Sequence, residues 1–344
     1  MPLSRLVRYP IWALQLFGPT KSFARNPILG NPRLNELGLH SYRLGVAHRM
    51  ARWRRRSLAR HLSAQDAADF DRDGFILKRD YLPPDLWRAL QDEVAAMSLP
   101  AREMREGQTV TRMTPVTAST RAALPVAARV AADRGLNAMT RYVASYGGVP
   151  VWFFQTVIAE PDQGAADPQT ELHSDTFFPT AKAWLFLQDV GEDDGPFAYV
   201  PGSHRLSEAR RAWEHRCSIT AAQDARQNHR GGSLRVRAAE LDEMGLPGAR
   251  RMAVPANTLI IADTHGFHGR TPSQKRTVRV ELHGHHRSNP FQLWSAFDLK
   301  SWPWIRERQL DLSLAIEDFQ VARFGRRRHW HPVPAGPLDA PAHI

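Results

Sequence analysis

Cysteine is nearly absent from this sequence of 344 residues, in which Cys217 is the only one. A single cysteine excludes an internal disulfide framework and any metal site built from several thiolates, and it fits a reducing, cytosolic compartment. Long apolar runs are missing too: no uncharged apolar stretch reaches the roughly 18 residues of a conventional transmembrane helix. The hydrophobic share of 42% and the charged share of 24% are those of a globular protein with a sizeable core.

Acidic residues are scarce in the N-terminal part of the chain. Glu36 is the only acid among the first 65 residues, which hold twelve Lys or Arg and so carry the whole formal net charge of +11. Two apolar stretches lie in this basic arm, at residues 3–17 and 39–62. The second stretch places four apolar side chains at helical spacing, namely Tyr42, Val46, Met50 and Trp53. Apolar and aromatic residues flanked by arginines are typical of a helix that lies in an anionic lipid interface.

Three other interpretations of the arm compete with membrane binding. The apolar stripe could pack on the main domain and leave the arginines in water. The arm could bind nucleic acid, but no recognised motif accompanies the charge, so we expect no nucleic-acid partner. The first twenty residues could be a signal peptide, against which Pro10, Gln15 and the lack of an Ala-x-Ala cleavage site argue.

The rest of the chain changes from helical patterns to short strand-like runs. Helices are expected at residues 64–71 and 86–97, and between 121 and 145 with breaks near Pro125 and Gly135. Strands are expected at 74–82, 151–159, 183–188, 197–200, 259–263 and 277–283, separated by Gly- and Pro-containing turns. This order predicts a mainly β fold, a jelly-roll barrel wrapped by α-helices.

We divide the chain into three parts. Residues 1–62 form the basic arm, residues 63–290 the barrel domain, and residues 291–344 a helical and loop extension whose best helix is at 310–324. Residues 205–250 are rich in Arg and Ala and are interpreted as an insertion in the barrel domain.

The most informative motif for chemistry is His173-Ser174-Asp175. Residues i and i+2 of a strand point to the same face, so this imidazole and this carboxylate can share one cation. Because 15 His occur in the chain, a His-x-Asp motif alone is weak. A third ligand would complete a two-His-one-carboxylate triad, which leaves coordination positions open on Fe(II).

Two candidates for the third ligand lie three residues apart, His265 and His268, and an Arg follows each after eleven residues, Arg276 and Arg279. Strand alternation separates them. Thr277, Arg279, Glu281 and His283 form a polar set, and the residues between them are apolar. An Arg that pairs with a carboxylate inside a wet barrel belongs to the polar set, so we prefer Arg279 and His268. Zinc hydrolysis, the competing metal chemistry, would leave Arg279 without a role.

Several segments in this order resemble the phytanoyl-CoA dioxygenase family. They are Phe70-Asp-Arg-Asp-Gly-Phe-Ile76, Leu172-His-Ser-Asp-Thr-Phe-Phe-Pro179, Ala183-Trp-Leu-Phe-Leu187, Asp194-Gly-Pro-Phe-Ala-Tyr-Val-Pro-Gly-Ser-His-Arg205 and Pro255-Ala-Asn-Thr-Leu-Ile-Ile261 running into His268-Gly269. The resemblance spans about residues 64 to 285. It implies a double-stranded β-helix, Fe(II), 2-oxoglutarate as cosubstrate and O2, with ascorbate as a candidate reductant.

The resemblance also implies roles for individual residues. His173, Asp175 and His268 match the iron ligands, and Arg279 matches the Arg that binds the distal carboxylate of 2-oxoglutarate. Three further positions match residues near the cosubstrate: Trp184, Gln155 and Arg112. The sequence departs from the family where many members carry Ser and Asn after the last His ligand; here Arg270 and Pro272-Ser273 stand at those places.

The expected activity is hydroxylation of a C–H bond. Some bacterial relatives in this family hydroxylate the Kdo sugar of lipid A precursors at the inner membrane, and the basic arm is similar in kind to theirs. This similarity favours a glycolipid substrate and a peripheral location on the cytoplasmic face of that membrane. An acyl-CoA or a soluble metabolite is the alternative substrate, and a non-catalytic ligand-binding barrel is the alternative function.

Overall fold

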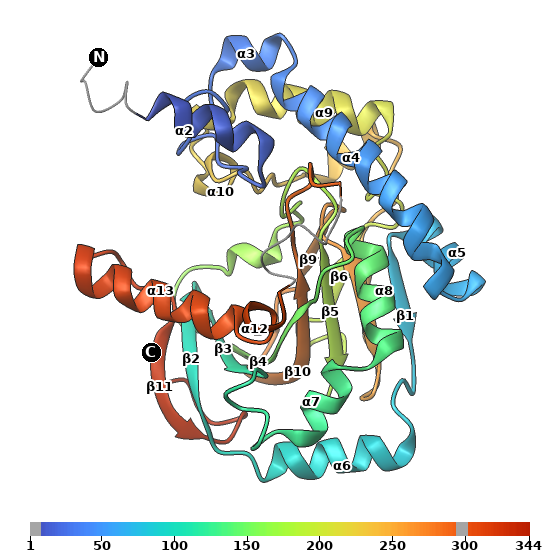
Figure 1. Cartoon of the computed structure of the whole chain (residues 1–344), viewed down its shortest axis with the longest axis vertical. Helices are drawn as coiled ribbons and strands as arrows, with labels where there is room; N and C mark the ends of the chain where they lie inside the picture. The colour runs from blue at the N-terminus through green and yellow to red at the C-terminus, as the bar shows by residue number, and fades with distance from the viewer. Residues whose placement is uncertain (1–7, 294–301) are drawn as a thin grey trace.

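The protein is described by a computed structural model covering residues 8–293 and 302–344, and its centre is a large antiparallel sheet (Figure 1). Eight strands form it in the spatial order β1 (Phe75–Lys78), β8 (Leu259–Asp263), β5 (Ala181–Phe186), β10 (Thr277–His286), β4 (Val151–Ala159), β3 (Thr109–Pro115), β2 (Leu99–Glu106) and β11 (His331–Gly336). A smaller antiparallel sheet consists of β7 (Arg250–Arg251), β6 (Phe197–Tyr199) and β9 (His268–Arg270).

Helices surround these sheets. The N-terminal part contains α2 (Tyr9–Leu14), η1 (Gln15–Phe17), α3 (Pro32–Glu36), α4 (Leu39–Leu58), η2 (Ala59–His61) and α5 (Ala64–Asp73). The barrel domain adds α6 (Pro84–Ala95), α7 (Pro125–Ala131), α8 (Arg134–Ala144), η3 (Pro168–Thr170), α9 (Glu208–Thr220), η4 (Ala221–Gln223), α10 (Gln227–Arg230) and α11 (Ala238–Glu243). The C-terminal part contains α12 (Pro303–Arg306) and α13 (Gln309–Phe324).

The arrangement confirms the predicted double-stranded β-helix wrapped by helices. The predicted strands 151–159 and 259–263 coincide with β4 and β8, and β10 continues three residues beyond its predicted end to His286. The helices α9 to α11 occupy the predicted insertion. Sequence reasoning missed the hairpin β2–β3 and the edge strand β11, which pairs with β2. β11 carries Pro332 and Pro334, which are unusual in a strand and are tolerated at a sheet edge.

The two faces of the large sheet have different surroundings. One face packs against α6, α7 and α8 and buries an extensive apolar core that includes Leu90, Leu136 and Phe154. The other face looks toward the small sheet, where Trp184, Phe197 and Tyr199 pack together. The polar residues of the central strand β10 point into this second space, which is where the candidate site lies.

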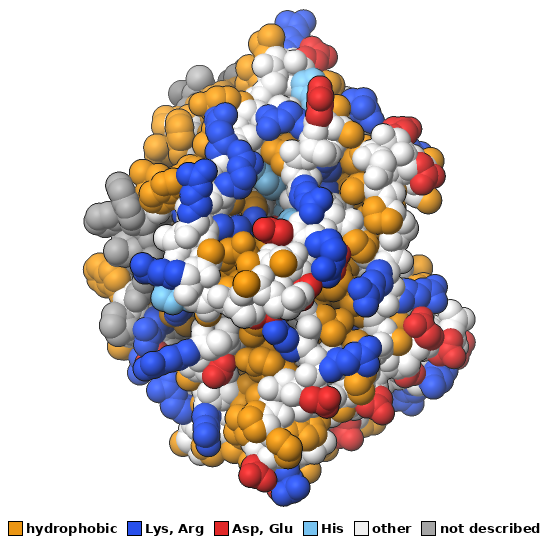
Figure 2. Space-filling view, turned by 90° about the vertical axis from the view of Figure 1, so that its right-hand side faces the viewer, with side chains coloured by type: hydrophobic (Ala, Val, Ile, Leu, Met, Phe, Trp, Pro, Cys, Tyr) orange, Lys and Arg blue, Asp and Glu red, His pale blue; other side chains and the backbone are white. Residues whose placement is uncertain are grey.

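The basic arm packs on the body of the protein, but through the face opposite to the predicted apolar stripe. The buried side of α4 carries Leu44, Ala47 and Ala51 together with His40, Arg43, His48 and Arg54. The predicted stripe faces outward: Tyr42 is 69% and Trp53 48% exposed. Figure 2 looks at the side of the molecule that carries α4 and α5, and Lys and Arg side chains are interspersed there with hydrophobic ones.

Two buried arginines of α4 bind backbone carbonyls instead of carboxylates. Arg43 donates to the carbonyls of Leu16, Gly18 and Thr20, which fixes the loop after η1. Arg54 donates to the carbonyl of Ser145 and, at 3.0 Å each, to those of Pro290 and Gln292. Arginine suits this role because its five donors can satisfy several carbonyls at once.

We predict that Arg54→Ala lowers the free energy of unfolding by about 2–4 kcal/mol, because three backbone carbonyls lose a charged donor in a buried place. Urea unfolding measures the change. The control is Arg52→Ala, whose side chain is exposed on the same helix and which should change stability by less than about 0.5 kcal/mol. Equal stability of the two variants would show that α4 does not depend on this anchor.

Candidate metal centre

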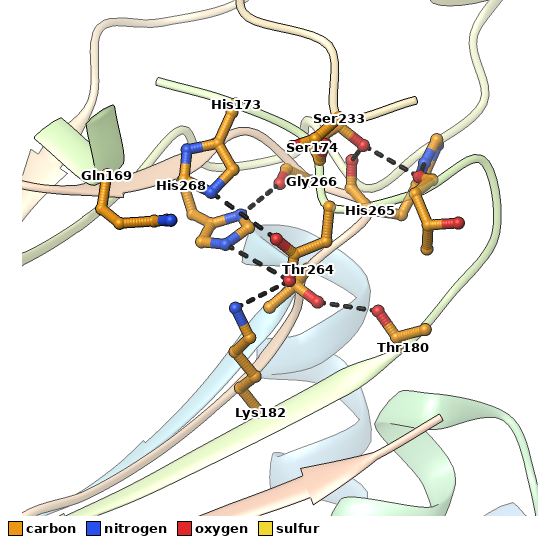
Figure 3. Close-up of polar contacts among 12 residues, drawn as sticks. Gln169, His173, Ser174, Thr180, Lys182, Ser233, Thr264, His265, Gly266 and His268 are labelled. Carbon is orange, nitrogen blue, oxygen red and sulfur yellow. Dashed lines mark hydrogen bonds and ion pairs between the residues drawn. The ribbon is translucent and has the colours of Figure 1, made fainter. Parts of the chain in front are cut away.

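His173 and His268 are direct cross-strand partners. His173 lies in the loop after η3, and its backbone exchanges two hydrogen bonds with that of His268 at the start of β9, at 2.8 and 2.9 Å. The two rings consequently lie side by side, with centroids 4.5 Å apart. Figure 3 shows both imidazoles directed to one place, with Lys182 of β5 approaching the same place.

Asp175 completes the group, as expected from its i+2 spacing to His173. Its carboxylate oxygens lie 3.6 Å from Nε2 of His173 and 3.8 Å from Nε2 of His268. One ligand atom from each of the three residues can be chosen so that all lie within 4.8 Å of one another. Three side chains that converge in this way can bind a single metal ion.

Hydrogen bonds on the far side of each ring leave the Nε2 atoms free for a metal. Nδ1 of His173 lies 2.7 Å from the carbonyl of Glu171, and Nδ1 of His268 lies 2.9 Å from that of Gly266. Because a carbonyl only accepts, each Nδ1 carries the proton and each Nε2 a lone pair. Nε2 of His268 is buried and has no hydrogen-bond partner among the described residues. A buried ring nitrogen without a hydrogen-bond partner, beside a carboxylate and a second imidazole, fits a metal ion.

The pKa values of His268 and Asp175 favour the protonation states in which these side chains bind a metal. Burial lowers the pKa of His268 to about 3, so its ring is neutral at physiological pH. Burial alone would raise the pKa of Asp175, but Lys182 lies 2.8 Å from its carboxylate and holds the pKa well below the usual range. A neutral imidazole and an ionised carboxylate are the forms that bind divalent metals.

Two of the three residues, His173 and His268, line a cavity of about 180 Å3 that Arg279 also lines. Arg279 is 6% exposed, and its Nε donates to the Glu281 carboxylate at 2.9 Å. Its Nη1 donates to the carbonyl of Gly195. These two hydrogen bonds use Nε and Nη1, and neither of them uses Nη2. The guanidinium is therefore held firmly while part of it faces a cavity shared with the metal ligands.

Gln155 and Trp184 also line this cavity. Gln155 of β4 donates to Glu281 at 2.7 Å, so it connects to Arg279 through a shared carboxylate. Trp184 of β5 packs against Phe197, with ring centroids 4.4 Å apart, and forms an apolar wall. The structure thus brings five of the seven sequence-predicted residues into the lining of one cavity, and a sixth, Asp175, lies against its two histidines.

Arg112 lies elsewhere, which corrects the prediction that it stands near the cosubstrate. Its guanidinium donates to the buried Glu103 carboxylate and to the carbonyls of Leu338, Ala340 and Pro341, so it anchors the C-terminal segment. Strand alternation is the reason: Thr111, the neighbour of Arg112 in β3, lines the cavity, and Arg112 points to the opposite face.

His265, the alternative third ligand, belongs to another cluster. Its Nδ1 lies 3.0 Å from the carbonyl of Thr176, and its ring packs on His48 of α4 with centroids 4.4 Å apart. The backbone turns at Gly266, where a side chain would collide with Tyr199. This turn directs His265 toward the arm and His268 toward the cavity.

Sequence reasoning missed three residues of the site. Lys182 pairs with Asp175, and Lys21 of the arm donates a hydrogen bond to the backbone carbonyl of Asp175 across 154 positions of the chain. His283 of β10 lines the cavity, and its buried Nδ1 has no partner among the described residues. His283 was visible in the polar set of β10, whereas no local pattern connects Lys21 with residue 175.

Residues 70–240 match a family model whose description is Phytanoyl-CoA dioxygenase (PhyH). This match agrees with the family resemblance of the motifs, and that resemblance implies iron as the metal and 2-oxoglutarate as the cosubstrate. No curated protein sequence matches the chain.

Solved structures that match the chain include three proteins of low sequence identity. The epimerase SnoN from nogalamycin biosynthesis, described as non-heme and alpha ketoglutarate dependent, is 17% identical, and the alignment covers 65% of this chain and 81% of SnoN with a TM-score of 0.41. HygX from Streptomyces hygroscopicus, with nickel, 2-oxoglutarate and hygromycin B bound, is 17% identical over 65% of this chain and 87% of HygX, with a TM-score of 0.39. AviO1 from Streptomyces viridochromogenes is 17% identical over 65% and 94% of the two chains, also with a TM-score of 0.39.

We predict that the protein binds one equivalent of Mn(II), a redox-stable substitute for Fe(II), and that His268→Ala or Asp175→Ala weakens binding at least about 100-fold because one of three ligands is lost. Isothermal titration calorimetry measures the affinity. His331→Ala is the matched control, since that histidine is exposed on β11. Equally tight binding by His268→Ala would mean that the metal is held elsewhere.

Proposed function

The chain carries a phytanoyl-CoA dioxygenase domain over residues 70–240, and on this premise we propose that this non-haem iron, 2-oxoglutarate-dependent dioxygenase hydroxylates a C–H bond of an anionic glycolipid at a membrane surface. The observation that carries the reaction class is the convergence of His173, Asp175 and His268 beside a cavity that Arg279 lines. Three such ligands would hold an iron ion and would leave coordination positions open to cosubstrate and dioxygen.

Each residue of the cavity has a role in this reaction. Bound iron supplies the redox chemistry, in which O2 and 2-oxoglutarate give succinate, CO2 and one oxygen atom inserted into the substrate C–H bond. Arg279 pairs with the distal carboxylate of 2-oxoglutarate, and Glu281 fixes the orientation of its guanidinium. Trp184 and Phe197 form a wall that excludes water. The intact Asp175 carboxylate favours hydroxylation over halogenation, which needs a vacant ligand position.

The exposed apolar residues of the arm support action at a membrane. Leu14 and Phe17 are each 72% exposed, and Ile11 of α2 is exposed beside them. Side chains of this kind bury apolar area in the interface of a bilayer. Among the described residues no helix is long and apolar enough to cross a membrane. An interfacial contact is therefore the mode that fits these side chains.

The C-terminal extension also exposes apolar side chains. Ile316, Phe319 and Phe324 of α13 are exposed, the last two by 61% and 63%. Pro19, two residues after η1, and residues of α13 line one common groove. On the arm, the outward side of α4 exposes Arg49, Arg52 and Arg56, which anionic headgroups would attract.

The substrate we propose is a glycolipid of the lipid A/Kdo type on the cytoplasmic face of the inner membrane. The family domain, the basic arm and the exposed apolar residues around the groove support this choice. Mass spectrometry of membrane lipids from cells with and without the protein would detect the product as a gain of one oxygen atom. An unchanged lipid profile would direct the search to acyl-CoA thioesters and soluble metabolites.

We expect Arg279→Gln to raise the KM for 2-oxoglutarate at least about tenfold, because a charge-assisted hydrogen bond to the distal carboxylate is lost. Succinate formation in the absence of a second substrate reports this value. Arg276→Gln, an exposed neighbour, should leave it unchanged. Because Arg279→Gln leaves Glu281 without its cationic partner, Arg279→Lys serves as a charged substitute that should recover part of the affinity. A KM that is the same in all four proteins would contradict the assignment of Arg279.

Replacing Ile11, Leu14 and Phe17 together by Ser should reduce binding to phosphatidylglycerol vesicles about tenfold or more, because three exposed apolar side chains no longer enter the interface. Sedimentation with vesicles at low salt measures the bound fraction, and phosphatidylcholine vesicles show the contribution of charge. These point variants are preferable to deletion of the arm, which would remove α4 and expose the part of the body that its buried side covers. Undiminished binding of the triple variant would contradict the role of α2 and η1.

A further inference from the structure

Four cationic side chains lie near the candidate metal centre: Lys21, Lys182, Arg235 and Arg287. Lys21 donates to the backbone carbonyl of Asp175, and Lys182 contacts its carboxylate. Arg235 is the bridge partner of His173, and Arg287 binds the carbonyl of Pro19, two residues before Lys21. Two of them have a carboxylate partner: Lys182 pairs with Asp175, and Arg235 lies 3.5 Å from the Glu171 carboxylate. The other two, Lys21 and Arg287, have no carboxylate partner among the described residues.

Lys21 and Arg287 bind only neutral groups among the described residues. Lys21 donates to the backbone carbonyl of Asp175, and Arg287 donates to the carbonyl of Pro19 at 3.1 Å and lies over the ring of Phe178. Both side chains are partly buried. A divalent metal and a 2-oxoglutarate dianion would cancel each other in charge. The two cations would therefore remain uncompensated in the loaded enzyme, and such a pair attracts an anion.

A largely apolar groove of about 810 Å3 lies next to the metal cavity. Phe153 and Trp330 line both spaces, so the groove and the cavity are neighbours. Arg287 lies in the groove, whose walls include Met113, Val151 and, from α13, Leu310 and Leu314. The inner face of β10 leads from Arg279 through His283 and His285 to this point, with Lys182 paired opposite His285.

We propose that Lys21 and Arg287 form the anion subsite for the substrate, and that the groove along α13 takes the apolar part of the same molecule. The ligand is thus an amphiphile whose carboxylate or phosphate lies beside the metal centre. The inference rests on the proposed function and deepens it, because it names the chemistry that selects the substrate. It also gives the basic arm a role in the site, since Lys21 belongs to the arm.

The test uses the full-length protein loaded with Mn(II) and 2-oxoglutarate, and dodecyl phosphate below its critical micelle concentration as the probe. Calorimetry should show that Lys21→Gln and Arg287→Gln each weaken binding about tenfold, as expected for one charge-assisted hydrogen bond. Arg33→Gln, an exposed position of the arm, is the matched control and should bind like the wild type. Lys21→Arg and Arg287→Lys keep the charge and should stay within about threefold of the wild type.

Two further probes separate the headgroup from the chain. Inorganic phosphate should bind the wild type more weakly than dodecyl phosphate and lose affinity in the same two Gln variants. Dodecyl maltoside, which is neutral, should bind weakly and equally to all proteins. Equal binding of dodecyl phosphate to wild type and Gln variants, or equal affinity for the neutral amphiphile, would overturn the subsite.

Binding of 2-oxoglutarate to the same Mn(II)-loaded proteins distinguishes failure of the anion subsite from failure of the proposed function. We expect Arg287→Gln to retain it within about threefold, because Arg287 does not line the cavity that holds Arg279. Loss of 2-oxoglutarate binding already in the wild type would refute the proposed function. Intact 2-oxoglutarate binding with unaltered anion binding in the variants would refute the subsite alone.

Discussion

The pair of backbone hydrogen bonds between His173 and His268 is the constraint on which the site depends. The two residues are 95 positions apart, and their side chains lie together because their backbones form one antiparallel bridge. Asp175 is two residues after His173, and side chains at this spacing in extended chain point to the same side. The bridge that positions His173 therefore positions Asp175 as well. Each ring is then oriented by a local carbonyl, of Glu171 or of Gly266. A shift of this pairing by one residue would turn one imidazole away from the other.

The surroundings of this site come from parts of the chain outside the strands. The arm contributes Lys21, the insertion contributes Arg235, and the C-terminal extension builds one wall of the groove. Several arginines of the arm are committed to the interior, where Arg43 and Arg54 bind backbone carbonyls. A net charge counted from the sequence therefore overstates what the arm presents to a membrane. What remains outside is a mixed surface of arginines and apolar side chains.

Much of the fold could be predicted from periodicity and turn residues, because buried strands such as β4 and β8 are short apolar runs between clear breaks. The hairpin β2–β3 could not, since Leu99–Glu106 contains a proline and two adjacent pairs of charged residues and so lacks the alternation that indicates a strand. For the site, alternation along β10 separated Arg279 from Arg276 and so His268 from His265. Alternation along β3 could have excluded Arg112 only if the sequence showed that its neighbour Thr111 faces the cavity, and the sequence does not show this. The role of Lys21 depends on a tertiary contact that no local pattern encodes.

The central claim is that one metal ion bound by His173, Asp175 and His268 also holds 2-oxoglutarate. Anaerobic titration of the Fe(II)-loaded protein with 2-oxoglutarate tests it most directly, because chelation of ferrous iron by the keto acid produces a charge-transfer band in the visible spectrum. The account predicts that the band saturates at one equivalent of 2-oxoglutarate per iron and disappears in His268→Gln. A protein that binds iron stoichiometrically but gives no band, or a His268→Gln variant with an undiminished band, would contradict it.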